Sequence, residues 1–579
     1  MSNARLLFLI AVLFLGSMLW TEWQKEQMIA RQAEQPNTAQ PNATQAASGV
    51  ASQTAAASLP SAGEVPTAAP PSATPGEVPQ LAPSAPAGDS PATSVAPSGR
   101  KISFSTDVMQ GEIDLAGGDI NSLMLTKYRK HGGEGPVQMF SADPASVHRA
   151  QNGWVASAGV APDHTATFVS DATSYALANG KQQIEIPLTW QDPSGVSVRK
   201  IYTLRRGSYV VAVRFEVVNN SASEWRASNY RQLQRLPGQL PSGFFVSNPE
   251  TFAFTGAAVH SAELGFKKLK FDKFDSQPFT GTFAGGWSAM LQHHFISAWI
   301  PPAAELVQYS TVVVKPNGAL PQRYMIRQQA PELAVAPGAK AEYQVALFAG
   351  PKLQDMIAKV APGLELTVDY GLLTFLSKPL FWVLDLLHSV VQNWGFAIIL
   401  LTLLVKLAMF KLSDAQYRSM AKMRKFQPKM QALQERYKED RSKLSAAMME
   451  LYKTEKINPL GGCLPMLVQI PVFIALYWVI FESVELRQAP FMLWIQDLSV
   501  KDPFYVLPVL NAAIMWYTQK LTPMTGMDPM QQKVFQFLPL VMAVMLAFFP
   551  AGLVLYWCAQ GGLNLLQQAY IMRKYADAK

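Results

Sequence analysis

The chain has 579 residues and a formal net charge of +8; 49% of its residues are hydrophobic and only 16% are charged. Soluble domains carry about a quarter charged residues, so this composition excludes an ordinary soluble protein and indicates a membrane protein. Its two cysteines, Cys463 and Cys558, lie in apolar segments without metal or redox spacing. We expect them to be small buried hydrophobic residues and not a disulfide.

The N-terminal region, residues 1–35, contains the apolar run LLFLIAVLFLGSMLW at 6–20. A run this short is also typical of a cleaved signal peptide. However, it ends in Trp20 and continues into Glu22 and Trp23, an interfacial flank, and no small-x-small cleavage site follows. We therefore favour an uncleaved signal-anchor span with a cytoplasmic N-terminus.

Residues 36–99 hold twelve prolines among Ala, Ser, Thr and Gln, and no aromatic residue. Such a segment buries too little apolar surface to offset the entropy that is lost on ordering. We expect a disordered Pro/Ala-rich tether between the anchor and the domain that follows.

Residues 100–360 show period-two alternation at 184–190, 196–203 and 209–218, punctuated by Gly, Asn, Asp and Pro. This pattern predicts one large antiparallel β-sandwich. His293 and His294 suggest a metal site at first sight, but adjacent residues of a strand point to opposite faces. We therefore expect both histidines to be structural.

Residues 361–579 form the predicted membrane domain. Residues 372–391 are apolar but contain Lys378, Pro379 and Asp385, which favours an amphipathic helix at the membrane interface. The apolar stretch 534–570 would extend about 55 Å as one helix, too long for a single span, and Pro550 is the natural break. The predicted spans of this domain are 396–412, 464–481, 504–518, 534–549 and 553–570. With the anchor, six spans result.

Charges in the short loops predict the orientation. Residues 411–456 carry twelve Lys/Arg against six Asp/Glu, whereas 482–502 carry two against four. Residues 520–533 and the C-terminal tail are basic again. The positive-inside rule places the basic segments and both termini in the cytoplasm and the β-domain outside, as expected in the inner membrane of a Gram-negative bacterium.

The basic segment 413–456 has helical periodicity that breaks near residues 439–440, which predicts a cytoplasmic helical hairpin. In the simplest interpretation, the hairpin is solvated and its charged residues only set the topology of the chain in the membrane. Alternatively, flexible methionines would offer an adaptable surface to varied apolar segments, and a basic face would bind anionic lipid or ribosomal RNA. The methionines considered for contact are Met420, Met423, Met430 and Met448.

Lys406 lies well inside the predicted span IILLTLLVKLAMF at 398–410. A long side chain of this kind can snorkel to the headgroups, or it can line a wet cavity. Thr402 is one turn earlier on the same face. Other polar residues of the spans are Gln469, Asn564, Gln567 and Gln568. No intramembrane carboxylate is available to pair with Lys406, and the outer half has almost no polar residue, which favours a groove open to the inside.

Several long motifs carry a family resemblance. They are AQYRSMAKMRKFQPKMQAL at 415–433, INPLGGCLPMLVQIPVFIALY at 457–477, SVELRQAPFMLWIQDLS at 483–499, DPMQQK at 528–533, FPAGLVLYW at 549–557 and GWSAMLQHHFISAWIP at 286–301. Together they resemble the YidC family of bacterial membrane protein insertases across the whole chain. The resemblance implies a polytopic α-helical membrane protein with a five-helix insertase core and a periplasmic β-sandwich.

The resemblance also implies an ATP-independent insertase and chaperone, not an enzyme, without cofactor or metal. Implied partners are nascent membrane proteins, the Sec translocon, transiently the ribosome, and lipids, with no specific nucleic-acid site. The family carries a positive residue, usually arginine, in a hydrophilic groove where this chain has Lys406. Groove neighbours match Thr402, Gln469, Tyr556 and Trp557. A compact ammonium keeps the charge but not the bidentate geometry of arginine. The alternative is a secondary transporter or channel, for which we find neither an internal repeat nor a polar path through both leaflets.

Overall fold

The computed structural model describes residues 101–130, 135–238, 253–315, 321–414, 416–417, 426–437, 440–454, 464–521 and 529–576. The predicted anchor at 1–35 and the tether at 36–99 lie outside these residues. So do Met420, Met423 and Cys463.

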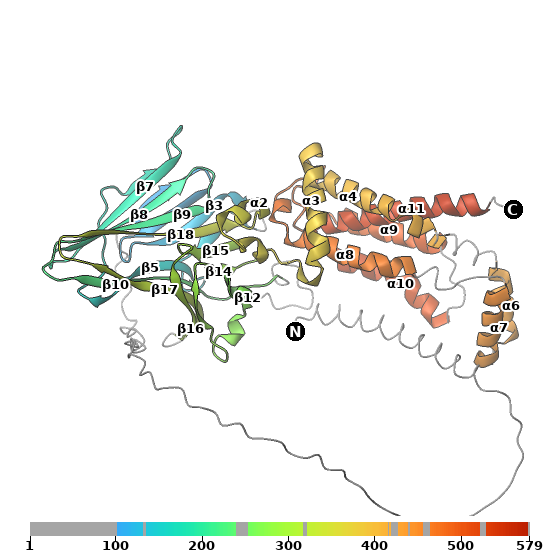
Figure 1. Cartoon of the computed structure of the whole chain (residues 1–579). Helices are drawn as coiled ribbons and strands as arrows, with labels where there is room; N and C mark the ends of the chain where they lie inside the picture. The colour runs from blue at the N-terminus through green and yellow to red at the C-terminus, as the bar shows by residue number, and fades with distance from the viewer. Residues whose placement is uncertain are drawn as a thin grey trace, which may run out of the picture. The chain divides into compact units, whose positions relative to one another are not determined.

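Two sheets form the β-domain, residues 101–351. The ten-stranded sheet has the order β13 (Thr280–Ala284), β16 (Leu306–Val314), β17 (Arg323–Val335), β10 (Trp225–Arg235), β5 (His148–Ala158), β3 (Asp119–Arg129), β2 (Met109–Asp114), β1 (Lys101–Ser105) and β6 (Ser174–Ala176), with β4 (Pro136–Phe140) paired to β3. The eight-stranded sheet has the order β12 (Gly265–Leu269), β11 (Gly256–Ser261), β14 (Trp287–Leu291), β15 (Phe295–Ile300), β18 (Lys340–Pro351), β9 (Val210–Asn219), β8 (Val196–Arg205) and β7 (Gln183–Gln191). Figure 1 shows β7, β8, β9 and β18 side by side.

The alternating segments of the sequence are strands, as predicted. In β9, every second residue is buried, which turns one face of the strand toward the interior and the other outward. Among the strands that the structure describes, the pairing is antiparallel with one exception, because β1 also pairs with β6 in parallel through Phe104 and Tyr175. The predicted antiparallel sandwich thus contains a parallel pair at this edge, which the sequence pattern did not indicate.

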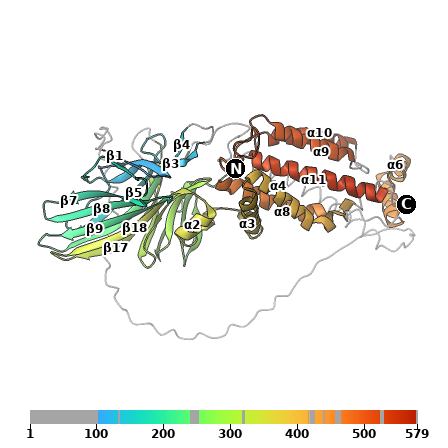
Figure 2. The same ribbon diagram turned by 90° about the horizontal axis from the view of Figure 1, so that it is seen from above.

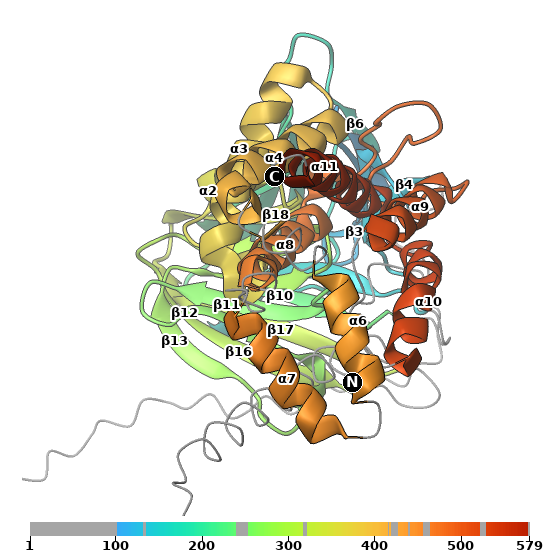
Figure 3. The same cartoon turned by 90° about the vertical axis from the view of Figure 1, so that its right-hand side faces the viewer.

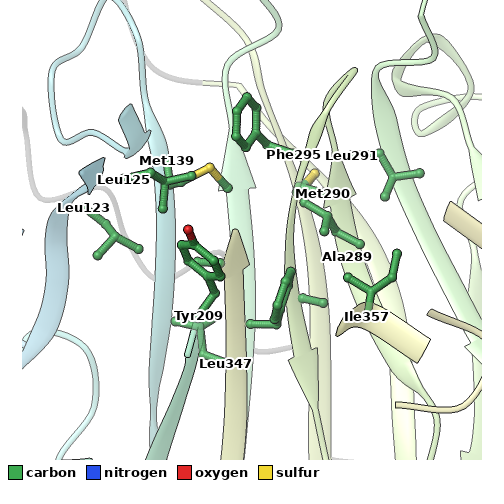
Figure 4. Packing of buried hydrophobic residues seen from close by; sticks show 14 of the residues in the cluster. Leu123, Leu125, Met139, Tyr209, Ala289, Met290, Leu291, Phe295, Leu347 and Ile357 are labelled. Carbon is green, nitrogen blue, oxygen red and sulfur yellow. The ribbon is translucent and has the colours of Figure 1, made fainter. Parts of the chain in front are cut away.

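Most buried apolar side chains of both sheets form one core, and a smaller cluster is formed by Val259, Phe279, Val307 and Tyr309. Figure 4 shows part of the main core, where Leu123 and Leu125 of β3 lie near Tyr209, which directly precedes β9, and Leu347 of β18. All four are buried. Each buried aliphatic side chain of this size contributes about 1.5–3 kcal/mol through apolar burial, so this interface is what holds the sheets together.

A buried ion pair crosses the core between the sheets. The Nζ of Lys200, on β8, lies 3.0 Å from Oδ1 of Asp119, on β3. The ammonium is also 3.4 Å from the backbone oxygens of Gly117 and Asn152. Burial lowers the pKa of Lys200 and raises that of Asp119, while the ion pair opposes both shifts. The three rings around the ammonium, at 5.4–5.9 Å, belong to Phe168, Tyr202 and Phe215.

His293 and His294 do not lie on opposite faces of a strand. They form the turn between β14 and β15, where the alternation of a strand does not apply, and their rings stack 3.8 Å apart. Their Nε2 atoms lie 2.8 and 3.3 Å from the backbone oxygen of Phe481, at the end of a helix. The prediction about their direction was wrong, and both side chains are buried in a contact between the β-domain and the helices.

The helices that follow the β-domain are α2 (Gln354–Val360), α3 (Thr374–Val391), α4 (Trp394–Ala408), α6 (Gln427–Arg436), α7 (Arg441–Thr454), α8 (Leu464–Glu482), α9 (Val506–Leu521), α10 (Pro529–Leu546) and α11 (Ala551–Ala576). Figure 2 shows α11 between α9 and α4, and Figure 3 shows the same neighbours end-on. Helix α10 packs against α9, and α3 packs against α4 and α8. The predicted break at Pro550 separates α10 from α11.

One helical stretch within the described ranges, Gly371–Val391, has the length and apolar composition to cross a membrane. It is the stretch for which we predicted an interfacial position. Apolar stretches of shorter length are Trp394–Ala408, Gln469–Glu482 and Gln536–Leu546. Helix α3 buries Phe381 and Leu384 and exposes a second apolar face that includes Trp382. The six-span count stays a prediction.

Candidate functional site

Lys406 is buried between two helices that are far apart in sequence. It lies on α4 and is only 6% exposed. Its Nζ donates a hydrogen bond of 2.5 Å to Oδ1 of Asn564, on α11. The side chain is therefore bound across the α4–α11 interface, and a neutral amide is its partner instead of a carboxylate.

Thr402 lies one turn before Lys406 and is 1% exposed. Its hydroxyl donates to the backbone oxygen of Ile398, one turn earlier still, at 2.7 Å. This bond satisfies the hydroxyl within its own helix. Thr402 and Lys406 thus share the buried face of α4, as their spacing predicts.

Polar side chains continue along α11 beyond Asn564. Gln568 is 1% exposed, and Gln567 is partly buried with its Nε2 atom enclosed and without a hydrogen-bond acceptor among the described residues. Tyr417, which follows α4, is buried and donates its hydroxyl to the backbone oxygen of Asn564 at 3.4 Å. Asn564 is therefore contacted by the side chains of both Lys406 and Tyr417.

Tyr556 and Trp557 lie near the start of α11, about 12 Å along the helix from Asn564 at 1.5 Å per residue. Trp557 stacks on Phe473 of α8 with 5.4 Å between ring centroids, and Tyr556 is 2% exposed. Gln469, also on α8, is partly buried. The structure thus brings Lys406 and Thr402 together on one helix, whereas the two aromatic residues belong to a separate apolar contact between α8 and α11.

The helices α6 and α7 lie within the segment predicted to be a cytoplasmic hairpin, and they contact each other. Met430 of α6 is buried and Met448 of α7 is partly buried. Exposed side chains of the pair include Lys429 and Lys443, so the outer surface is basic in part. The two helices therefore carry both buried methionine and exposed lysine side chains.

The end of the bundle nearest the β-domain is tied together by backbone hydrogen bonds. The N–H groups of Ala551 and Gly552, at the start of α11, donate to the carbonyl oxygens of Val500 and Leu498 at 2.6 and 2.9 Å. Arg487 of the same 482–502 loop donates to the backbone oxygen of a β3 residue at 2.8 Å. The loop thus covers this end of the helices.

The α4 helix begins under the same loop. Asn393 caps it by accepting from Phe396 N at 3.1 Å, and its Nδ2 donates to the backbone oxygen of Phe491 at 2.8 Å. A Cβ added to Gly395 would lie 2.1 Å from the Phe491 ring. The absence of a side chain at Gly395 is what allows the loop to pack this closely.

A separate cleft of 860 Å³ lies against β8, β9, β18, α2 and α3. Its charged lining residues are Arg205, Asp355, Lys359, Asp385 and Glu485. Burial raises the pKa of Glu485 to about 7, although its Oε1 accepts from the N–H of Gln354. The sequence did not predict this cleft, because its lining residues come from several elements that lie between Thr203 and Glu485 in the chain.

The described residues contain no group of three or more His, Cys, Asp or Glu side chains placed to hold a metal. Cys558 is a buried free thiol that donates to the backbone oxygen of Leu507 at 3.3 Å. This agrees with the expectation of a small buried residue at this position.

Two family models cover most of the chain. The model described as 60Kd inner membrane protein matches residues 386–578, and the model described as YidC periplasmic domain matches residues 101–383. Several relatives are named membrane protein insertase YidC. The relative from Xanthomonas campestris pv. campestris is 42% identical over 100% of this chain and 98% of its own length. The relative from Aeromonas hydrophila is 43% identical over 99% of this chain and 98% of its own. The relative from Alkalilimnicola ehrlichii is 46% identical over 82% of this chain and 83% of its own length.

Proposed function

Because the chain belongs to the YidC family of membrane protein insertases, we propose that it inserts short-tailed inner-membrane proteins without ATP, through a hydrophilic groove beside α4 and α11. The protein is a non-enzymatic insertase of the inner membrane with a periplasmic domain. The groove, its residues and its direction are the parts that we propose.

The buried ammonium of Lys406 is the observation that carries this proposal. A charge inside an apolar helix costs about 2.5–3.5 kcal/mol on insertion scales. It is retained here on the inner face of the bundle, beside Thr402 and the polar side chains of α11. An ammonium in this position attracts the acidic residues of a passing chain, and the polar face lowers the cost of moving a hydrophilic tail into the membrane.

The covered end of the bundle supports a groove that is open on one side only. Backbone bonds of the 482–502 loop to α11 tie the end nearest the β-domain, which in the proposed topology is periplasmic. A groove closed there opens to the cytoplasm and the inner leaflet. This arrangement suits lateral release of a segment into lipid and does not suit a continuous channel.

The proposed topology has six spans, with the N-terminal anchor, five helices in the membrane domain, and both termini in the cytoplasm. We propose that α3 lies at the periplasmic interface, where its exposed Trp382 and its apolar face would contact lipid. The excess of basic residues in segment 413–456 supports a cytoplasmic hairpin. There the hairpin would meet nascent chains, and transiently the ribosome, before they reach the groove. Cooperation with the Sec translocon is a further part of the proposal.

Reconstitution tests the function directly. Purified protein in liposomes, without ATP, is expected to insert a single-span substrate with a short acidic tail, scored by protection of the tail from external protease. Lys406→Glu should reduce this insertion at least severalfold, whereas Lys406→Arg, which keeps the charge, should retain most of it. Solute flux without insertion would instead indicate a transporter. Normal insertion by Lys406→Glu would refute the attraction by Lys406.

A further inference from the structure

We infer that Asn564 is a positioning residue for Lys406, and that its neutral amide sets a preference of the groove for segments carrying a carboxylate. This inference rests on the proposed function of the groove. It concerns a residue of α11 that contacts the ammonium directly, and it predicts which substrates benefit from that contact.

The geometry first explains why Lys406 stays between the helices. Four methylene groups give a lysine on a membrane helix enough reach to extend toward the headgroups. Here the ammonium is instead bound to Asn564 Oδ1 at 2.5 Å, and the side chain is 6% exposed. The bond joins residues 158 positions apart. Without the amide, the flexible side chain would be free to leave the interface for the lipid surface.

The position of Asn564 is itself held. Its backbone oxygen accepts from the hydroxyl of Tyr417 at 3.4 Å, and α11 packs directly on α4. The neighbouring Thr402 uses its hydroxyl hydrogen on the backbone oxygen of Ile398. Asn564 is therefore the residue that locates the ammonium relative to α11, whereas Thr402 is engaged with its own helix.

The chemistry of the partner decides what the ammonium can still bind. An amide oxygen accepts one hydrogen bond without neutralising the positive charge, and an ammonium has three donors. Among the described residues, no second hydrogen-bond acceptor contacts the Nζ of Lys406. A carboxylate of an incoming segment can therefore bind the remaining donors or displace the amide, because it adds the attraction between opposite charges to the hydrogen bond, which the neutral amide does not supply. An aspartate at position 564 would itself neutralise the ammonium and remove this selectivity.

The test compares two substrates that differ only in a short translocated tail, one with two aspartates and one with two asparagines. The full-length protein in liposomes is assayed for the insertion rate of each, and the measured quantity is the ratio of the two rates. Lys406→Met gives the ratio that remains without the charge. Asn564→Gln is the matched control, because it keeps a neutral amide at the same place on α11.

Asn564→Asp should lower the acidic-to-neutral ratio to that of Lys406→Met, a fall of about tenfold if one charge-assisted bond is lost. Asn564→Ala should lower the ratio about threefold or more, because the charge is kept but its position is not. Asn564→Gln should restore most of the preference. Thermal unfolding of each variant separates misfolding from a change of preference, since misfolding lowers both rates together and leaves the ratio unchanged.

A ratio for Asn564→Asp equal to that of the unsubstituted protein, in a variant that folds, would overturn the inference. An unchanged ratio in Asn564→Ala would refute the positioning role in the same way. These results differ from a failure of the proposed function, in which the unsubstituted protein inserts neither substrate.

Discussion

The buried pair of Lys200 and Asp119 makes the strongest stability prediction for the β-domain. Asp119→Asn keeps the shape of the side chain but removes its charge, which leaves the ammonium of Lys200, 0% exposed, without an anionic partner. Removing one member of a buried ion pair costs about 3–5 kcal/mol. We expect the lower end of this range, because two backbone oxygens at 3.4 Å and three surrounding rings remain.

The assay is thermal unfolding of the full-length protein in detergent, followed by tryptophan fluorescence. Trp154 reports on this core, since its ring lies 5.5 Å from that of Phe215, one of the rings around the ammonium. A loss of about 3 kcal/mol corresponds to a fall of about 6–12 °C in the midpoint for a domain of this size. The double variant Asp119→Asn/Lys200→Met, which buries no charge, should recover at least half of this fall.

An exposed ion pair of the same domain provides the control. Lys101 and Glu112 are 3.0 Å apart but 46% exposed on both sides, so Glu112→Gln should cost less than about 1 kcal/mol. A midpoint for Asp119→Asn that falls no further than that of Glu112→Gln would refute the reasoning. The reasoning would also be refuted if the double variant lost more stability than the sum of the losses in Asp119→Asn and Lys200→Met.

Three further predictions concern other positions. Burial holds the pKa of His148 well below 6.5. Below pH 6.5 the unfolded chain therefore binds a proton that the folded state does not. As the pH falls, this residue should reduce the unfolding free energy by up to about 1.4 kcal/mol per pH unit. A urea-unfolding difference between His148→Gln and the unsubstituted protein that is the same at pH 7 and pH 5 would contradict this. Asn393→Ala removes the cap of α4 and the hydrogen bond to the 482–502 loop, so it should lower the unfolding free energy by about 1 kcal/mol or more. Asn393→Ser should keep the cap. The loss is measured as faster protease cleavage of the loop in the alanine variant. Gly286 has φ +85° and a Cβ there would lie 2.1 Å from a carbonyl oxygen of β11, so Gly286→Ala should lower the thermal midpoint clearly more than Gly207→Ala, where φ is also positive but the space is open.

Much of the secondary structure follows from local periodicity. The alternation at 209–218 is β9, and the apolar run predicted at 464–481 is α8, Leu464–Glu482, because strand and helix periods act over a few residues. The hairpin segments α6 and α7 also follow the predicted break. The direction of His293 and His294 was missed for the opposite reason, since a turn interrupts the alternation on which the prediction depended.

Contacts between distant residues could not be derived in the same way. Asn564 was visible in the sequence as a polar residue of an apolar helix, but nothing in one sequence says which side chain 158 positions away it binds. The absence of a carboxylate partner for Lys406 was inferred from composition, whereas its amide partner depends on how α4 and α11 pack. The parallel pairing of β1 with β6 has the same origin in tertiary packing.

The junction between the 482–502 loop and the start of α11 is held by main-chain hydrogen bonds, whereas the contact of Lys406 with Asn564 is made by side chains. Both donors, at Ala551 and Gly552, and both acceptors, at Leu498 and Val500, are main-chain atoms. Most single amino-acid exchanges leave such a junction intact, because every residue except proline brings the same N–H and C=O groups. A genetic screen for a loosened junction would therefore find few hits in a library of single substitutions. The library should instead contain insertions, deletions and proline substitutions at 551 and 552. These changes alter the chain length or remove the backbone N–H donors on which the junction depends.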